Sequence, residues 1–205
     1  METIIKKPIY NVLELFYENK NQPLHLRDIA RKVNLNESSV SRHLNFLVKK
    51  EILKQKPDGN LKKFYLSANK LPNIFPIYDS KKINSLPLLR RKAIKMYLEK
   101  LPKKPIFVLL FGSTAKGTFK NNSDLDFLEV HNSKLKNDAA LKYVESQTGI
   151  RINSFQLTEK QFEREMQTKK DKTVLSAINT GFPIFNQKYY WGLIYNEWKN
   201  IYTIS

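Results

Sequence analysis

The sequence has no cysteine, and its three histidines stand far apart, at His25, His43 and His131. Disulfide bonds and thiolate metal sites are therefore excluded, and no histidine cluster for a metal is predicted. The chain also lacks an apolar run as long as a membrane span, and its start lacks the apolar segment of a secretion signal. These absences predict a cytoplasmic protein without a membrane partner.

Acidic residues are scarce relative to basic ones. The 205 residues include 36 Lys and Arg against 19 Asp and Glu, which gives a formal net charge of +17. An excess of this size points to nucleic acid or another polyanion as a partner. Residues 1–70 hold 14 basic and 7 acidic residues and residues 71–105 hold 9 and 2, whereas residues 106–205 hold 13 and 10. The surplus charge therefore belongs to the front half of the chain.

The second half contains neither a Walker-type phosphate loop nor an evident Ser-His-Asp arrangement. It does contain a distinctive stretch, IFVLLFGSTAKGTFKNNSDLDFLE, over residues 106–129. The six apolar residues 106–111 form a short run rich in β-formers, which predicts a buried strand. The strand ends at Gly112 and Ser113, where a glycine lets the backbone approach a phosphate and the hydroxyl can donate to it. A short helix is expected over residues 114–117.

Two carboxylates follow this turn, since Asp124 and Asp126 alternate with apolar residues after ten further positions. The alternation predicts a second strand, over residues 125–131, with both carboxylates on the same face. Two close like charges repel each other, and a fold tolerates them mainly when a cation lies between them. Hard oxygen ligands suit Mg²⁺, which commonly arrives with a nucleoside triphosphate.

This pattern resembles the signature of the DNA polymerase β-type nucleotidyltransferases, and specifically of the minimal versions common in archaea and bacteria. The matching residues are Gly112, Ser113, Ala115, Lys116, Gly117, Ser123, Asp124 and Asp126. The resemblance implies transfer of a nucleoside monophosphate, by family habit AMP from ATP, with Mg²⁺ or Mn²⁺ as the metal. It also implies that Asp124 and Asp126 are catalytic and bind the metal, and that the nucleotide is bound by Gly112, Ser113, Lys116 and Ser123. The alternative is an Asx-rich loop between two strands.

The third carboxylate of the active family members is not evident. The strand expected to carry it, over residues 150–157, contains no acid, and Asn153 stands near the expected place, with Ser154 as the other candidate. An amide oxygen ligates Mg²⁺ weakly and cannot act as a general base at neutral pH. Glu129 is expected to point to the opposite face of its strand. The sequence thus supports nucleotide binding better than it supports phosphoryl transfer.

The first 70 residues predict three helices and a basic hairpin. The helices are expected from Pro8, over residues 27–33 and over residues 37–50, with Asn36 capping the third, and the hairpin turns at residues 57–60. These elements form a winged helix-turn-helix, and residues 35–53 resemble the second half of this motif in ArsR- and MarR-like DNA-binding proteins. The alternative is a protein-docking module whose charges keep it soluble.

Double-stranded DNA is the expected partner of this domain. The polar face of the third helix is suited to the major groove, and the basic hairpin to the backbone or the minor groove. The predicted contacts on the helix are Ser38, Ser41, Arg42, Asn45 and Lys49, and those on the hairpin are Lys54, Lys56, Lys62 and Lys63. Winged-helix proteins commonly bind DNA as dimers, so a homodimer is expected.

The expected fold class is α+β: a winged helix-turn-helix over residues 1–70, a linker over residues 71–87, and a mixed α/β nucleotidyltransferase-like domain over residues 88–205. The linker has three prolines and no clear period. A basic helix over residues 88–101 is expected to bury Leu89, Ala93, Met96 and Tyr97. Its charges suit either a DNA surface or a solvated face. Further elements are expected at residues 136–148, 150–157, from 159 after the cap Thr158, 172–179, 181–185 and 189–198.

Three functions remain open at this stage. The first is a DNA-binding nucleotidyltransferase with an unspecified acceptor. The second is a transcription regulator whose nucleotidyltransferase-like domain has lost chemistry and serves nucleotide sensing or dimerisation. The third follows from the resemblance to antitoxins that carry the same signature and modify a HEPN-type toxin. Tyr189, Tyr190 and Trp191 are suited either to stacking on a base or to a core.

Overall fold

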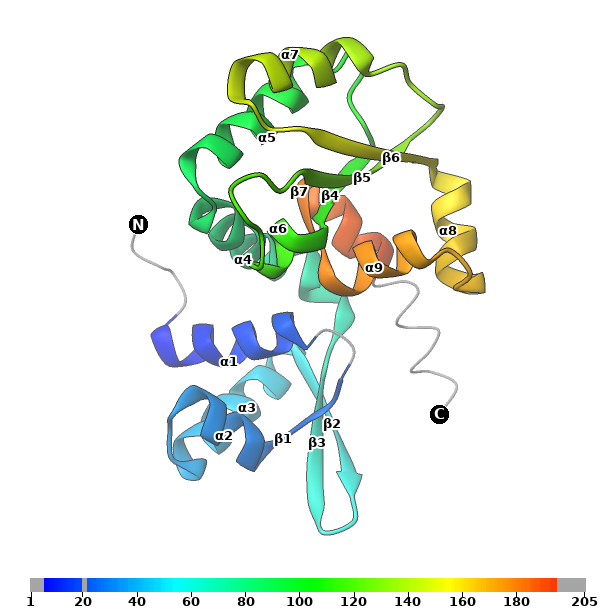
Figure 1. Cartoon of the computed structure of the whole chain (residues 1–205). Coiled ribbons are helices and arrows are strands. Elements are labelled where there is room, and N and C mark those ends of the chain that lie inside the picture. The colour runs from blue at the N-terminus through cyan, green and yellow to red at the C-terminus, as the bar shows by residue number, and fades with distance from the viewer. Residues whose placement is uncertain (1–5, 20–21, 195–205) are drawn as a thin grey trace. The chain divides into compact units, whose positions relative to one another are not determined.

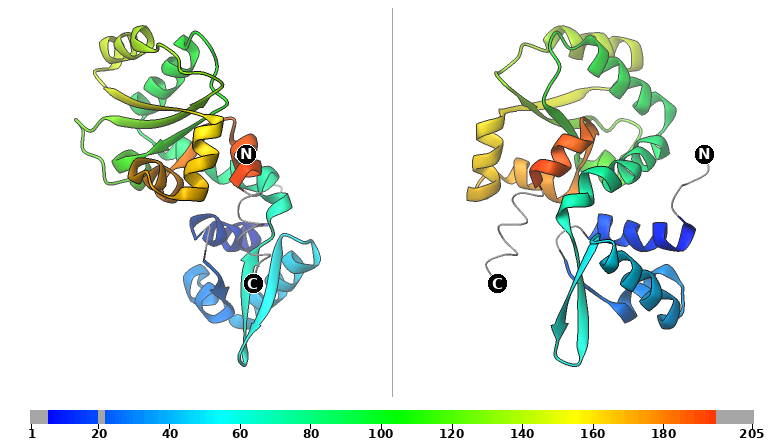
Figure 2. Two further views of the ribbon diagram at one scale, coloured as in Figure 1. Left: turned by 90° about the vertical axis from the view of Figure 1, so that its right-hand side faces the viewer. Right: turned by 180° about the vertical axis from the view of Figure 1, so that it is seen from behind.

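The computed structural model of the chain describes residues 6–19 and 22–194 (Figures 1 and 2). The chain divides into two compact units, with boundaries after Tyr78 and after Tyr190. Among the described residues, no helix has the length and apolar character needed to cross a membrane. The mixture of helices and sheets confirms the predicted α+β fold class.

The first unit is built from three helices and a small antiparallel sheet. Asn36 caps the third helix as predicted, because its side chain accepts a hydrogen bond from the Ser39 N–H at 2.8 Å. The three strands lie in the order β1-β3-β2, and the helices bury the apolar residues that the helical period predicts, among them Val12, Ile29 and Leu44. The elements are α1 (Lys7–Glu18), β1 (Leu24–His25), α2 (Leu26–Val33), α3 (Glu37–Lys49), β2 (Leu53–Asp58), β3 (Leu61–Leu66) and the short 3-10 helix η1 (Ala68–Lys70).

The hairpin of β2 and β3 is the wing of this helix-turn-helix. Its strands pair without interruption from Leu53 opposite Leu66 to Asp58 opposite Leu61. The turn is therefore shorter than predicted, since only Gly59 and Asn60 stand outside the pairing. Gly59 has a φ of +58°, which a glycine adopts without steric cost.

The segment predicted as a linker without a clear period has regular structure, because residues 71–85 form a helix, α4 (Leu71–Ser85). Pro72 lies in its first turn, where a missing N–H costs no hydrogen bond, and Pro76 lies inside it. Ring packing stabilises the helix despite Pro76. The Phe75 ring lies 4.8 Å from that of Trp191, and the Tyr78 ring lies 4.9 Å from that of Tyr10. These rings belong to the core of the first unit, and its boundary falls inside α4.

The second unit is a four-stranded mixed sheet with helices on both faces (Figure 1). The strand order is β6-β5-β4-β7, with β4 antiparallel to both of its neighbours and β5 parallel to β6. The helices α5 and α7 cover one face, and α8 and α9 lie on the other (Figure 1). The elements are α5 (Leu88–Lys100), β4 (Phe107–Phe111), α6 (Gly112–Lys116), β5 (Leu125–His131), α7 (Asp138–Thr148), β6 (Ile152–Thr158), α8 (Glu159–Thr168), α9 (Lys172–Thr180) and β7 (Phe182–Phe185).

The predicted cap of α8 and the closing strand are both present. Thr158 accepts from the Gln161 N–H in a capping box, and residues 182–185 pair with β4. Residues 187–194 are helical, and the rest of the helix predicted over residues 189–198 lies outside the described residues. Tyr190 and Trp191 are buried, so they serve as core residues and do not stack on a base.

Candidate functional site

The two carboxylates predicted to share a face meet at the start of β5. Asp124 directly precedes the strand and Asp126 is its second residue, and both are half-buried. The Asn153 amide nitrogen donates to Asp126 Oδ1 at 3.0 Å and to Asp124 Oδ2 at 3.3 Å. A single donor therefore reaches both carboxylates, which lie on the same side of the sheet as the strand alternation predicts.

The register of β5 and β6 selects Asn153 over Ser154 at this position. Asn153 lies opposite Asp126, whereas Ser154 lies opposite Phe127 on the other face of the sheet. No group of three or more His, Cys, Asp or Glu residues suited to a metal occurs in the described part of the chain. The site thus offers two carboxylates and one amide. The neutral amide donates hydrogen bonds at the point where a cation would otherwise relieve the repulsion between the two carboxylates.

Gly112 lies directly against the carboxylate of Asp126. It has a φ of +70°, and a Cβ placed on it would lie 2.1 Å from Asp126 Oδ2. Only glycine satisfies both conditions, because any side chain would displace the carboxylate. Gly112 is also the first residue of α6, which begins two residues earlier than predicted and ends before Gly117 at a φ of +73°.

An arginine of the basic helix, which the sequence predicts on a charged surface, is instead buried behind the site. Arg90 is 3% exposed, and its guanidinium donates to Thr114 Oγ1 at 2.9 Å, to the Lys120 carbonyl at 3.0 Å and to the Ser123 carbonyl at 2.8 Å. Burial lowers the pKa of Arg90, and the charge of Asp124 opposes that shift. The residue connects α5 to the loop that leads to the carboxylates.

The apolar side predicted for α5 is wrong at one position. Leu89 is 48% exposed, and Arg90 takes its place on the face that points to the sheet. The helical period does place Arg90 three and four residues before the buried Ala93 and Ile94, so the signal was present in the sequence. It was missed because a charged residue seldom occupies a core-facing position.

The other predicted nucleotide-binding residues are not all gathered at the carboxylates. Ser123 Oγ accepts a hydrogen bond from the Lys120 N–H at 2.9 Å, which closes the turn before Asp124. Lys116 is exposed and lines a cavity of about 310 Å³. That cavity is formed by Lys82, Ser85, Leu86, Thr114, Ala115, Lys116, Gly117, Phe119 and Phe182, and its lining does not include the carboxylates.

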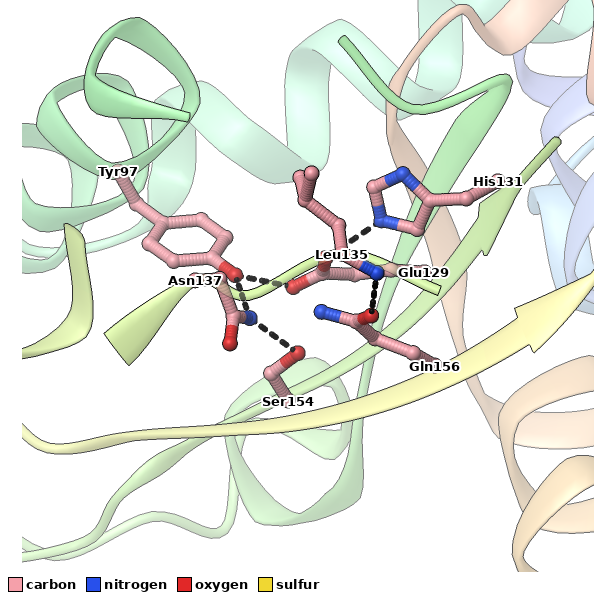
Figure 3. A network of polar contacts seen from close by, with 7 residues as sticks. All are labelled: Tyr97, Glu129, His131, Leu135, Asn137, Ser154 and Gln156. Atoms are coloured by element: carbon pink, nitrogen blue, oxygen red, sulfur yellow. Dashed lines mark hydrogen bonds and ion pairs between the residues drawn. The ribbon is translucent and has the colours of Figure 1, made fainter. Parts of the chain in front are cut away.

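Glu129 lies on the opposite face of β5 from Asp126, as predicted, inside a buried polar network (Figure 3). The Tyr97 hydroxyl donates to Glu129 Oε1 at 2.5 Å, and His131 Nε2 lies 2.9 Å from Glu129 Oε2. Burial, followed by the charge of Glu129, raises the pKa of Tyr97. Glu129 therefore cannot serve as the third carboxylate of the site.

The same network fixes the loop between β5 and α7 (Figure 3). The Asn137 amide nitrogen donates to the Tyr97 hydroxyl at 2.6 Å and to Ser154 Oγ at 2.8 Å. The Leu135 N–H donates to Gln156 Oε1 at 3.0 Å. These bonds anchor β6 at Ser154, which follows Asn153, and at Gln156, so the network supports the site from behind the sheet.

The predicted DNA face of α3 is accessible. Of its five residues, Ser41 is half-buried and the others are exposed: Ser38, Arg42, Asn45 and Lys49. Two of them hold local hydrogen bonds, since the Ser38 hydroxyl donates to Asn36 Oδ1 at 2.9 Å and the Arg42 guanidinium donates to Ser39 Oγ at 3.2 Å. Arg42 and Asn45 are one turn of helix apart, which suits readout of adjacent bases.

The lysines of the wing are divided between its two faces. The strand register places Lys54, Lys56 and Lys63 on one face and Lys62 on the other. Lys63 Nζ lies 2.8 Å from Asp58 Oδ2, and His25 Nε2 lies 3.4 Å from the same oxygen. The hydrogen bond to Asp58 raises the pKa of Lys63. Lys62 is exposed.

Comparison with family models finds two matches. Residues 91–179 match the nucleotidyltransferase domain, and residues 10–57 match the IclR helix-turn-helix domain. The first match covers both carboxylates. The second is to the IclR type, whereas the sequence pattern resembles the ArsR and MarR types, so only the shared winged helix-turn-helix architecture is confirmed. A search of curated proteins finds no match.

Two solved structures are distantly similar to this chain. A crystal structure of a toxin-antitoxin with AMP-PNP is 16% identical and matches 55% of this chain and 89% of that chain, with a TM-score of 0.36. A crystal structure of a mutant of the toxin-antitoxin MntA-HpeT is 18% identical and matches 55% of this chain and 88% of that chain, also with a TM-score of 0.36.

Proposed function

We propose that this chain, which joins an N-terminal winged helix-turn-helix domain to a C-terminal nucleotidyltransferase domain, is a DNA-binding enzyme that transfers a nucleoside monophosphate to an acceptor hydroxyl. The observation that supports transfer is the convergence of Asp124 and Asp126 on the amide nitrogen of Asn153, with Gly112 leaving room for the Asp126 carboxylate. The acceptor is left open, and AMP from ATP is the proposed group.

The donor set fits one divalent cation. Asp124 and Asp126 already direct oxygens at the single amide nitrogen of Asn153, so a cation at that point would meet two carboxylates. Carboxylate oxygens are ligands that Mg²⁺ and Mn²⁺ accept, and the Asn153 side chain would turn its amide oxygen towards the ion in place of the nitrogen that faces the carboxylates in the absence of an ion. When bound there, such an ion would neutralise charge on the triphosphate and on the transferring phosphoryl group.

The residues of the chain have separate tasks in this proposal. Gly112 and Ser113 hold the β and γ phosphates, with Lys116 and Ser123 as further nucleotide contacts. The acceptor oxygen forms a bond to the α-phosphorus, the bond from that phosphorus to the α,β-bridging oxygen breaks, and pyrophosphate leaves with the electron pair. Because Asn153 cannot accept a proton, the hydroxyl proton passes to water. The missing base lowers the rate without abolishing transfer, since positioning and charge neutralisation carry most of phosphoryl transfer.

The test compares ATP labelled on the α-phosphate with ATP labelled on the γ-phosphate, each with Mg²⁺ or Mn²⁺ and with candidate acceptors that include a HEPN-type protein. Transfer of the α label alone supports the proposal, and its loss in Asp124→Ala/Asp126→Ala links it to the site. Glu99→Gln is the matched control, because it removes an exposed carboxylate from the same unit. Absence of labelled product under every condition would overturn the proposal.

The absence of an acid at position 153 favours a second function, a transcription regulator that senses the nucleotide without turning it over. Calorimetry separates the two functions. Binding of ATP with Mg²⁺ that depends on Asp126, with no α-label transfer, identifies the sensor, whereas binding accompanied by transfer identifies the enzyme.

A further inference from the structure

The turn that precedes Asp124 is closed by its own end residues. The Ser123 N–H donates to the Lys120 carbonyl at 3.0 Å, and Ser123 Oγ accepts from the Lys120 N–H at 2.9 Å. Both end carbonyls also accept from one nitrogen of Arg90, at 3.0 Å from Lys120 and 2.8 Å from Ser123. The side chain of Arg90 therefore holds the two ends of the turn with a single group.

A second guanidinium nitrogen of Arg90, Nη1, connects this turn to α6. It donates to Thr114 Oγ1 at 2.9 Å, and that hydroxyl lies 3.4 Å from the Asp124 carbonyl, to which it donates. The Arg90 Cζ also lies 4.3 Å from the centre of the Phe119 ring, which covers the guanidinium from the loop side. One residue of α5 thus contacts the start and the end of the segment between α6 and β5.

A buried guanidinium is costly unless hydrogen bonds satisfy it. Hydrogen bonds from Arg90 to neutral oxygens offset this cost. The negative charge of Asp124 nearby also favours the protonated guanidinium. Lysine cannot replace it, because an ammonium is a compact point charge without the planar fork that reaches several acceptors at once. If position 90 served only to pack α5 on the sheet, an apolar side chain would suffice there, as at Ala93 and Ile94.

We propose that Arg90 is a positioning residue that fixes Asp124 against Asp126, so that both carboxylates reach one cation. This inference rests on the proposed function. The turn sets the direction in which the chain enters β5. Asp124 precedes the strand, so pairing with a neighbouring strand does not fix its position. Asp126, by contrast, is held in register by β4 and β6.

The test uses the full-length chain and the variants Arg90→Lys and Arg90→Ala, with Lys92→Gln as the control that removes an exposed charge from the same helix. We expect kcat to fall roughly 100-fold in Arg90→Ala, as for other misplacements of about 1 Å. The metal concentration for half-maximal activity should rise, and Arg90→Lys should restore little of either. Lys92→Gln should leave both unchanged.

Two further measurements separate positioning from folding. Added guanidinium at millimolar concentration should restore part of the activity of Arg90→Ala, whereas ammonium should not. Amide hydrogen exchange should quicken at Ser123 and Leu125 but not in β4. Unchanged kcat and metal dependence in a folded Arg90→Ala would overturn the proposal, as would exchange that quickens equally throughout the unit.

The exchange measurement also keeps this inference distinct from the proposed function. If the wild-type chain neither transfers a nucleotide nor binds one, the proposed function fails. The role of Arg90 in holding the turn is then still decided, because exchange at Ser123 does not depend on activity.

Discussion

Asn153 lies directly opposite Asp126 in the parallel pairing of β5 and β6, and its amide nitrogen donates to that carboxylate at 3.0 Å. The parallel register gives two side chains on one face that are close enough to share a ligand. An amide in this place stabilises two carboxylates without a metal, whereas an acid would add to their repulsion. The residue at position 153 therefore sets how strongly the site depends on a cation.

Asn153→Asp is expected to make the unit depend on a divalent metal. Without metal, the third carboxylate should lower the melting temperature, because the three charges repel each other. Mg²⁺ should raise the melting temperature of this variant more than that of the wild type, since tighter binding to the folded state stabilises it. If transfer occurs, the added base should raise kcat by about 100-fold or more.

Thermal unfolding with and without Mg²⁺ measures the first effect, and α-label transfer measures the second. Asn153→Ala is the control, because it removes the amide without adding a charge. Equal responses of the two variants to Mg²⁺ would contradict a cation site at Asp124 and Asp126.

Gly112→Ala is expected to destabilise the second unit and displace Asp126. The left-handed conformation costs an alanine about 1–2 kcal/mol, and the Cβ would in addition lie 2.1 Å from the carboxylate. Gly149→Ala is a matched control: its φ of +66° is similar, yet nothing lies within 4 Å of its Cβ. Urea unfolding should show a larger loss for Gly112→Ala, and equal losses would contradict the steric contact.

The elements around the site could be predicted because their signals are local. The apolar run before Gly112 and the alternation around Asp126 each specify a strand within a few residues, and the observed β5 has the predicted bounds. The cap at Asn36 is likewise a local hydrogen bond. The opposite face assigned to Glu129 followed from alternation alone.

The features that were missed depend on contacts distant in sequence. Nothing near Pro76 predicts a helix, and α4 depends on rings that include Trp191. The helical period places Arg90 on the buried face of α5, but its three acceptors lie 24 to 33 residues further along the chain, so α5 alone does not show what satisfies the guanidinium. The network of Glu129 also joins α5, β5, the loop before α7 and β6, so only the fold reveals it.

The ion pair in the wing predicts how the hairpin responds to pH. The hydrogen bond from Lys63 lowers the pKa of Asp58 from 3.8, and that from Asp58 raises the pKa of Lys63 from 10.5. The contribution of Asp58 is therefore present above pH 3.8 and is lost as the pH falls through its lowered folded pKa. The contribution of Lys63 is present below pH 10.5 and is lost as the pH rises through its raised folded pKa.

NMR titration of the Asp58 carboxyl measures this coupling. In Lys63→Met the pKa of Asp58 should move up towards 3.8, whereas Lys62→Met should leave it unchanged because Lys62 lies on the other face of the wing. A carboxyl that titrates identically in the wild type and in Lys63→Met would show that the pair does not persist in solution.

The same pairing predicts that two neighbouring lysines contribute unequally to DNA binding. Lys62 is exposed, whereas Asp58 lies 2.8 Å from Lys63 and offsets its charge. Lys62→Ala should therefore weaken binding to all sequences alike and reduce the slope of log affinity against log salt by about one. Lys63→Ala should change the slope less, because a phosphate must compete with Asp58 for that ammonium.

Arg42→Ala provides the contrast on the recognition helix, since its loss should reduce the preference for one sequence by about 1–3 kcal/mol. Fluorescence anisotropy with a selected site and a scrambled duplex, each over a series of salt concentrations, separates these effects. Equal slope changes for Lys62→Ala and Lys63→Ala would contradict the role given to Asp58. If the affinity for DNA responds to none of the three variants, the wing and the recognition helix would instead be surfaces that dock on protein. The reason is that loss of a lysine that contacts a phosphate must change the number of counterions released on binding.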